Sequence, residues 1–483
     1  MSDPNHSVLL STFVNGKKKV KIIFHKEVLV WENEKAPLDQ HTVPIENVLS
    51  VEHCYLKETH PSLQREIDYN QFIIHYAEKS VEDKWVYKSI ILQHSDPLQV
   101  ASWVKTLKNH LAKFHKRPKH LLLFVNPFGG KQNAMQIYEK YGKALFAIAG
   151  VEVTVNVSQR KDQIKDFLIT HNLDMFDAVA CVGGDGTVSE MFNGLVLREC
   201  RSTGIDANDI HQTLPKPKIP IGIIPGGSTD TIAYCLHGTS DPTTAVLQII
   251  FGDTVGLDLV SVYDEHHLLR LYASVLSYGY LGDVAFQSDQ YRWMGPLRYD
   301  YSGFKKLVLN KGYHGEIAIY TDKKDVEKQN CKSKCETCDR AASTQEKINC
   351  KWETIRGKFF MVSGANISCA CSRSPQGIAP YCHLGDGKVN LVLVKHTSFV
   401  NIIKLLLRLS SPYASVEDLP FVETISAREF CFRAIDKSNS KWNCDGEVQH
   451  QTNIRAKVRC QLLTIFSRGS DKLPNTKGSC CNF

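Results

Sequence analysis

The chain has 483 residues, of which 43% are hydrophobic and 23% are charged, and its net charge is +7. This length predicts about two to four domains, and the composition is typical of a soluble globular protein. The positive charge is spread along the chain, so it favours an anionic membrane surface and does not indicate nucleic-acid binding. Sixteen cysteines without a secretion signal indicate a reducing compartment. We therefore expect a cytoplasmic protein that is peripheral on membranes.

Short alternating segments in residues 1–116 predict a β-rich domain closed by one helix. The alternating segments are 19–24, 28–31, 47–51, 72–76 and 88–93. The expected helix spans 96–115, and Trp103 lies at the centre of its apolar face. This layout resembles a pleckstrin-homology domain, which implies binding to membranes that contain phosphoinositides. Lys17, Lys18 and Lys19 near the first turn suit an inositol phosphate headgroup, or they form a solvated basic turn.

Residues 117–251 alternate strands, glycine turns and helices. We expect strands at 121–125, 151–157, 178–182 and 219–224, with helices at 131–149, 159–171 and 187–197. The first strand is a continuous apolar run, typical of a parallel strand covered on both faces. The repeat predicts a doubly wound α/β nucleotide-binding domain with its ligand at the carboxyl ends of the strands.

The chain from 252 to 470 is β-rich. Its apolar or alternating segments are 269–278, 315–320, 358–364, 389–395 and 456–466. Their short spacing predicts a mostly antiparallel domain that meets the α/β domain across a cleft. A polar, Cys-rich insertion spans 322–350, and we expect residues 471–483 to form a flexible tail.

The turn after the third expected strand carries the clearest chemistry. Residues 181–190 read Cys-Val-Gly-Gly-Asp-Gly-Thr-Val-Ser-Glu. Glycines let the backbone approach a phosphate closely, and a helix start offers free N–H groups to an anion. Asp185 at its centre would repel phosphate unless a proton acceptor or a metal ligand is needed. The turn therefore predicts phosphoryl transfer, with Asp185 taking a hydroxyl proton or helping to hold Mg²⁺.

Two further glycine turns end neighbouring strands. They read Asn-Pro-Phe-Gly-Gly-Lys at 126–131 and Pro-Gly-Gly-Ser-Thr-Asp at 225–230. The first of them is not a Walker A loop, because the glycine spacing and the final Lys-Ser/Thr are missing. Three such turns at one edge of a sheet would form a single phosphate-binding rim.

The three turns together resemble those of the diacylglycerol kinase catalytic family, which includes sphingosine and ceramide kinases. Within it the chain most resembles the ceramide kinases, over nearly its whole length. Further segments that carry this resemblance are 277–283, 292–300, 369–375, 383–387 and 442–447. It implies a two-domain lipid kinase that uses ATP and Mg²⁺ to phosphorylate the primary hydroxyl of ceramide at Golgi or plasma membranes. The alternatives are sphingosine or diacylglycerol as acceptor, or a catalytically silent relative that binds lipid or membranes.

The resemblance also implies roles for individual residues. Asp185 would be the general base, and Asp283 would hold polar atoms of the lipid headgroup in the β-rich, lipid-binding domain. Asp445, with Glu447, would lie near Mg²⁺ or near the ribose and base. The implied nucleotide-binding residues are Asn126, Pro127, Phe128, Gly130, Gly184, Gly186, Thr187, Gly227, Ser228, Arg292, Arg298, Asp445, Gly446 and Glu447.

Some of these residues have a plainer interpretation. Arg292 and Arg298 would neutralise charge on the transferring phosphoryl group, or they are surface ion-pair partners. Asp445-Gly446 alone is a hairpin turn signal. His383 could be read as a base, but a lone histidine in a glycine-rich loop is more often structural.

The insertion contains Cys331, Cys335 and Cys338 in a CxxxCxxC pattern, and ceramide kinases carry a similar cluster. Three thiolates at this spacing can bind Zn²⁺, and Cys350 is a candidate for the fourth ligand. The alternative is a cluster of structural or reducible thiols.

Two other segments suggest a binding partner and a site of lipid attachment. Residues 398–409 form an apolar helix with Lys404 and Arg408 one turn apart. The resemblance implies a calmodulin-binding segment here, and hence a link to Ca²⁺, whereas two basic residues favour a core or membrane-facing helix. Near the end of the chain, Cys480 and Cys481 are candidates for lipidation.

Overall fold

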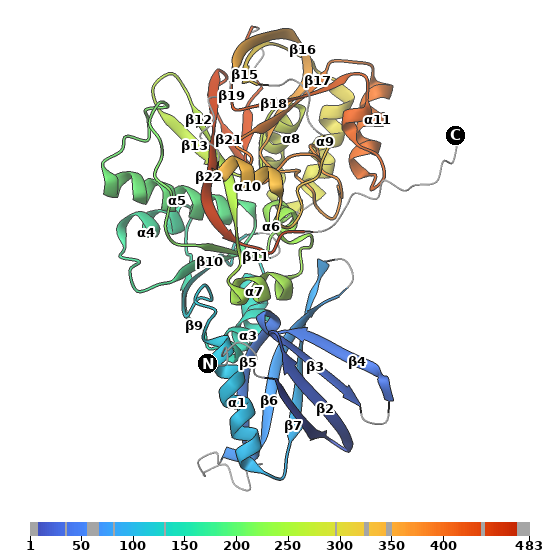
Figure 1. The fold of residues 1–483 in the computed structure, drawn as a ribbon. Helices are drawn as coiled ribbons and strands as arrows, with labels where there is room; N and C mark the ends of the chain where they lie inside the picture. The colour runs from blue at the N-terminus through green and yellow to red at the C-terminus, as the bar shows by residue number, and fades with distance from the viewer. Residues whose placement is uncertain are drawn as a thin grey trace.

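The computed structural model describes residues 8–33, 36–55, 67–80, 83–129, 132–294, 297–322, 328–343, 350–435 and 440–470. A smaller N-terminal domain lies against one end of a larger body (Figure 1). The larger body contains an α/β layer next to the N-terminal domain and a β-rich part beyond it (Figure 1). This is the architecture that the sequence predicts.

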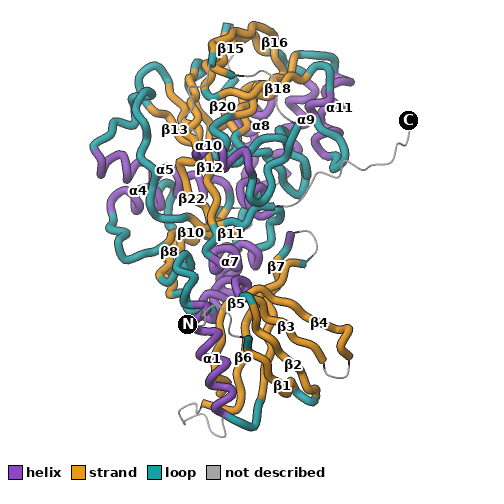
Figure 2. The backbone as a smooth tube through the Cα atoms, in the orientation of Figure 1, coloured by secondary structure: helices purple, strands orange, loops and turns teal. Residues whose placement is uncertain are grey.

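The N-terminal domain is a seven-stranded antiparallel sheet in the order β4-β3-β2-β1-β7-β6-β5, closed by α1 (Figure 2). Alternation along each strand directs apolar side chains inward, where Trp103 of α1 packs edge-on against Phe13. Asp96 caps α1 by accepting a hydrogen bond from the Leu98 N–H. The elements are β1 (Leu9–Asn15), β2 (Lys18–His25), β3 (Val28–Asn33), β4 (Ala36–Pro44), a 3₁₀ turn (Ile45–Asn47), β5 (Val48–Tyr55), β6 (Ile67–Lys79), β7 (Trp85–Gln93) and α1 (Pro97–Leu111).

The α/β layer has helices on both faces of a parallel sheet in the order β9-β8-β10-β11. Helices α4, α5 and α6 pack on one face, and α2, α3 and α7 pack on the other. All six residues of β10 are buried, as a central strand covered on both faces requires. The elements are β8 (His120–Val125), α2 (Ala134–Ile137), a π-helical turn (Tyr138–Gly142), α3 (Lys143–Ile148), β9 (Glu152–Val157), α4 (Gln163–Thr170), β10 (Ala178–Gly183), α5 (Asp185–Thr203), β11 (Ile221–Pro225), α6 (Thr231–His237) and α7 (Pro242–Phe251).

Strand β22, near the C-terminal end of the chain, joins the two parts of the larger body. Ile465 of β22 pairs with Ile221 of β11 in parallel, and β22 also runs antiparallel to β12. The α/β sheet therefore continues into the β-rich part. The remaining strands are β12 (Thr254–Tyr263), β13 (Leu268–Tyr272), β14 (Val275–Gly279), β15 (Tyr313–Thr321), β16 (Lys351–Ala365), β17 (Val389–Lys395), β18 (Val422–Ala427), β19 (Glu429–Ala434), β20 (Trp442–Cys444), β21 (Glu447–Gln449) and β22 (Ile454–Phe466).

Among the described residues, the β-rich part carries the helices α8, α9, α10 and α11. Both α8 and α9 follow β14, α10 lies in the Cys-rich insertion, and α11 follows β17 (Figure 1). Their bounds, with those of two 3₁₀ turns, are α8 (Tyr280–Ser288), a 3₁₀ turn (Asp289–Met294), α9 (Leu297–Leu309), α10 (Glu336–Ser343), α11 (Phe399–Ser410) and a 3₁₀ turn (Val416–Asp418).

The N-terminal domain is docked on α7. Trp85 packs edge-on against Phe251 with ring centroids 5.1 Å apart, and the backbone N–H of Trp85 donates to Thr244 Oγ1 at 2.9 Å. The guanidinium of Arg468 lies 3.9 Å from the Phe251 ring centroid and donates to Asn47 Oδ1 at 2.6 Å. Leu49 and Trp85 therefore belong to the same apolar core as α7.

Candidate active site

The three glycine turns leave the same edge of the parallel sheet. Val182 of β10 lies opposite Val125 of β8 on one side and Ile224 of β11 on the other. Asn126, directly after β8, donates from Nδ2 to Thr187 Oγ1 at 2.9 Å. This bond links the first turn to the helix that follows the second turn. Side by side, the turns form the rim that the sequence predicts.

The second and third turns touch through their glycines. A Cβ on Gly227 would lie 2.5 Å from the Gly184 Cα, and a Cβ on Gly184 would lie 3.0 Å from the Gly227 Cα. Gly183 is equally constrained, since a Cβ there would lie 2.6 Å from Thr187 Oγ1. The close approach of two backbones is what requires glycine at these positions.

Asp185 connects the starts of two helices. It is the first residue of α5, and its carboxylate accepts hydrogen bonds from the backbone N–H groups of Thr231 (3.1 Å) and Ile232 (3.0 Å) at the start of α6. Burial raises the pKa of Asp185 to about 6, the two N–H donors oppose this, and the charges of Asp230 and Asp445 add to it. A carboxylate with a pKa near the working pH is suited to general base catalysis.

Asp445, a predicted magnesium ligand, is hydrogen-bonded to the backbone of the β-rich part. Its buried carboxylate accepts hydrogen bonds from the N–H groups of Ala273, Ser274 and Val275 at 2.8–3.1 Å and from the Ser274 hydroxyl at 2.5 Å. These bonds occupy the carboxylate with the backbone between β13 and β14. They fix the β20–β21 turn, in which Gly446 has a φ of +86°. Asp445 thereby positions Glu447.

Glu447 belongs to an ion-pair network between the two parts of the larger body. Its Oε2 accepts from Arg270 at 2.7 Å and from Lys161 at 3.1 Å. Arg270 also donates twice to Ser189 Oγ of α5, at 2.9 and 3.2 Å. A cavity of about 260 Å³ lies beside this network, and Arg270, Lys165 and Glu190 are among its lining residues.

Sequence reasoning missed Arg270, Ser189 and Lys161. Arg270 lies in an ordinary short strand, and Lys161 lies among several exposed basic residues. The Ser189 position, four residues after Asp185 and therefore on the same side of α5, was the one available signal.

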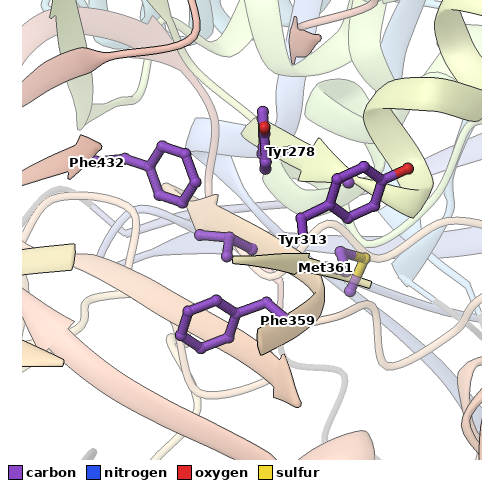
Figure 3. Close-up of a pocket in the computed structure, with 7 residues that line it drawn as sticks. Tyr278, Tyr313, Phe359, Met361 and Phe432 are labelled. Atoms are coloured by element: carbon purple, nitrogen blue, oxygen red, sulfur yellow. The ribbon is translucent and has the colours of Figure 1, made fainter. Parts of the chain in front are cut away.

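Asp283 lies beneath an apolar pocket. Its carboxylate is 8% exposed and accepts from the Tyr313 hydroxyl at 2.5 Å and the Ser440 hydroxyl at 2.6 Å, with Lys306 Nζ at 3.5 Å. In Figure 3 the Tyr313 ring faces the pocket and its hydroxyl points to one side, away from Phe359 and Phe432. The pocket leaves no room for a water molecule, and its lining is Tyr278, Gly279, Tyr313, Phe359, Met361, Val362 and Phe432.

For the other predicted nucleotide-binding residues, the structure gives mainly the exposure of the side chain. The Phe128 side chain is largely exposed, and its N–H donates to Asn126 Oδ1 in the turn that contains Pro127. Gly186 and Ser228 are exposed on the rim. Arg298 is half-buried on α9. Gly130 and the Arg292 side chain lie outside the described residues.

The cysteine cluster is completed by a histidine. Ligand atoms of Cys331, Cys335, Cys338 and His383 all lie within 4.8 Å of one another, so the cluster could bind a metal ion. Cys350, the candidate for the fourth ligand, is not part of this cluster. Cys350 precedes β16 and lies in the electrostatic environment of Arg428, Asp322 and Lys388 instead.

The segment 398–409 forms α11, which is partly packed. Ile402 and Leu405 are buried in the core, whereas Val400, Ile403 and Leu407 are exposed. In the described part of the chain, no helix is long and apolar enough to cross a membrane. The candidate lipidation sites Cys480 and Cys481 lie outside that part.

Family models match three consecutive stretches of the chain. They describe a ceramide kinase PH domain at residues 9–107, a diacylglycerol kinase catalytic domain at 120–262, and a ceramide kinase C-terminal domain at 274–483. The fold and site therefore define a lipid kinase with a diacylglycerol kinase catalytic domain, and the PH domain indicates peripheral association with membranes.

Similar proteins of known name place the chain in a narrower group of lipid kinases. The chain is 33% identical to ceramide kinase of Homo sapiens over 90% of each chain, and 32% identical to ceramide kinase of Mus musculus over 98% of each. A ceramide kinase-like protein of Homo sapiens is 28% identical over 77% of this chain and 73% of its own. A putative diacylglycerol kinase from Bacillus anthracis shares the fold, with a TM-score of 0.50 at 15% identity over 73% of this chain and 96% of its own. The chain belongs to the ceramide kinase family.

Proposed function

We propose that this chain is an ATP-dependent ceramide kinase that transfers the γ-phosphoryl group to the primary hydroxyl of ceramide. The observation that carries the proposal is the joined rim of glycine turns around Asp185, whose pKa is raised to about 6. Phosphoryl transfer depends mainly on positioning and on neutralising the charge of the phosphates. Backbone N–H groups at the rim would position the phosphates. Asp185 would accept the proton that the lipid hydroxyl releases.

The nucleotide would lie across the joint between the two parts of the larger body. Its phosphates would occupy the rim at Gly184, Gly186, Gly227 and Ser228, and Arg292 and Arg298 would neutralise their charge. Its ribose and base would lie toward the cavity of about 260 Å³ beside Arg270 and Glu447. Charged and polar groups line that cavity, as nucleotide recognition requires.

The Asp230 carboxylate at the rim suits Mg²⁺. It lies close enough to Asp185 for its charge to act on that residue, and a hard oxygen ligand of this kind would bind Mg²⁺ together with substrate phosphates while Asp185 serves as the base. Bound there, the ion would neutralise phosphate charge. Asp445 would contribute indirectly, because its hydrogen bonds fix the turn that carries Glu447.

The lipid headgroup would lie at Asp283. Ser440 and Tyr313 hold this carboxylate in place, and the aromatic pocket begins at Tyr313. The amide and hydroxyl groups of ceramide are hydrogen-bond donors that suit a carboxylate. The pocket leaves no room for a water molecule in this structure, so an acyl chain requires it to open.

The access route for lipid would run along the membrane. Exposed apolar residues are concentrated on the neighbouring helices α9 and α11, among them Phe304, Val308, Val400 and Leu407. This surface suits the membrane-facing interpretation of α11 better than calmodulin binding. The PH domain would add phosphoinositide recognition at the Lys17–Lys19 turn, at Golgi or plasma membranes.

The test is a panel of lipid acceptors. Purified full-length protein is incubated with Mg²⁺ and labelled ATP on vesicles that contain ceramide, sphingosine or diacylglycerol. We expect label on ceramide. Label on sphingosine or diacylglycerol alone would refute the choice of acceptor, and label on none of the three would favour a non-catalytic lipid-binding protein.

A further inference from the structure

We propose that Cys331, Cys335, Cys338 and His383 bind one structural Zn²⁺ ion that anchors the Cys-rich insertion to the loop before β17. The proposal is independent of the lipid acceptor. It rests on the geometry of the four ligand atoms, on the absence of buried residues in α10, and on a hydrogen-bonded support around the ligands.

The ligand atoms lie close enough together for one ion to bind all four, because they are all within 4.8 Å of one another. Cys331 Sγ and Cys338 Sγ are 3.8 Å apart, and Cys335 Sγ is 3.2 Å from His383 Nδ1. A Zn–S distance of about 2.3 Å gives tetrahedral S···S edges of about 3.8 Å, whereas a disulfide would bring two sulfurs to about 2.05 Å. Three cysteines and one histidine fill a closed four-coordinate site, which is the structural type of zinc site.

The insertion needs an anchor of this kind. Helix α10 has no buried residue, so apolar packing does not hold it against the domain. Cys335 directly precedes α10 and Cys338 lies in its first turn, where free N–H groups favour thiolates. Because a site of this kind is absent from an unfolded chain, the free energy of zinc binding would stabilise the folded insertion directly.

The support around the ligands comes from a bulge in β22. Gln461 adopts a left-handed backbone with a φ of +44°, and its side-chain Nε2 donates to the carbonyls of both Cys338 and Gly385 at 2.8 Å. Its backbone N–H donates to buried Asp258 at 2.6 Å. One side chain thus joins the segment of the three cysteines to the loop of His383. Outer contacts of this type orient the ligands of metal sites.

The ion would also hold one wall of a large cavity. A cavity of about 490 Å³ lies between α6, the 368–384 loop and the insertion, and Cys331 and Cys235 both line it. Cys235 of α6 contacts the Ser368 hydroxyl at 3.3 Å, and α6 begins at the N–H groups that bind Asp185. Loss of the metal would therefore loosen a loop that packs against α6.

The test measures the metal itself. Full-length protein is purified in reductant without chelators, and its zinc is quantified by mass spectrometry of the element. We expect about one Zn²⁺ per chain in the wild type and in the matched control Cys350→Ser, and a loss of at least about fivefold in Cys335→Ser and His383→Ala. His383→Cys should retain zinc, because a fourth thiolate replaces the imidazole.

A second measurement needs no variant. Wild-type protein is loaded with Co²⁺ in place of Zn²⁺, and the visible spectrum of tetrahedral thiolate-bound cobalt is expected. Absence of zinc from the wild type, together with a Cys331–Cys338 disulfide, would overturn the proposal. So would zinc that survives Cys335→Ser, or a cobalt spectrum without thiolate charge transfer.

Discussion

Asp185→Asn is expected to lower lipid phosphorylation by about 10²- to 10⁴-fold, the usual contribution of a general base. The amide cannot accept the proton of the acceptor hydroxyl, whereas its carbonyl oxygen can still accept one backbone hydrogen bond from the start of α6. ATP binding should be nearly unchanged. Steady-state assays on ceramide vesicles and a separate ATP-binding measurement check both expectations.

The pH dependence gives this prediction a second readout. Burial raises the pKa of Asp185 to about 6, so below that pH the carboxyl is protonated and cannot act as a base. Wild-type kcat/KM should therefore fall about tenfold per pH unit below pH 6 and level off above it. Asp166→Asn, whose side chain is half-exposed on α4, is the control and should keep this profile. An Asp185→Asn variant with near-normal turnover would exclude Asp185 as the base.

Gly227→Ala is expected to disrupt the rim. The added Cβ would lie 2.5 Å from the Gly184 Cα and 2.7 Å from Asp230 Oδ1. The first of these is a backbone contact, so the two turns must separate. We expect a loss of about 1–3 kcal/mol in unfolding free energy, as for other overpacked sites, and at least about tenfold weaker ATP binding. Thermal or denaturant unfolding and nucleotide titration measure the two effects.

Gly186→Ala is the matched comparison for stability. A Cβ at Gly186 meets no atom within 4 Å, and the residue lies in the first turn of α5, where alanine is favoured over glycine. The protein should be as stable as the wild type or slightly more so. Any loss of ATP binding in this variant would then report contact with the nucleotide. Equal stability of the Gly227→Ala and Gly186→Ala variants would contradict the packing of the two turns.

Local patterns were sufficient to predict the α/β layer and the position of its rim. Continuous apolar runs such as 178–182 and the glycine turns that follow them are signals contained within a few residues. Pairing between β11 and β22 was beyond reach, because the two strands are more than 200 residues apart and neither sequence encodes its partner. The chemistry of Asp185 followed from its neighbours in the turn, whereas its bonds to α6 depend on packing.

Contacts between segments that are distant in sequence also explain why His383 was not predicted as a metal ligand. The sequence offers Cys350 as a candidate ligand, whereas the fold brings His383 to the three cysteines from a separate loop. Likewise, the Asp445-Gly446-Glu447 stretch marked the right turn without revealing that Asp445 binds backbone and Glu447 binds Arg270. Contacts between distant segments decide such roles.

The most direct test of the proposed function is a competition between acceptors. Ceramide and diacylglycerol are presented at equal mole fraction in the same vesicles with Mg²⁺ and ATP, and the two phosphorylated products are quantified by mass spectrometry. The ratio of products gives the ratio of kcat/KM for the two lipids. We predict that ceramide 1-phosphate exceeds phosphorylated diacylglycerol by at least about tenfold, which corresponds to about 1.4 kcal/mol of discrimination. Equal products, or an excess of phosphorylated diacylglycerol, would contradict the proposed function.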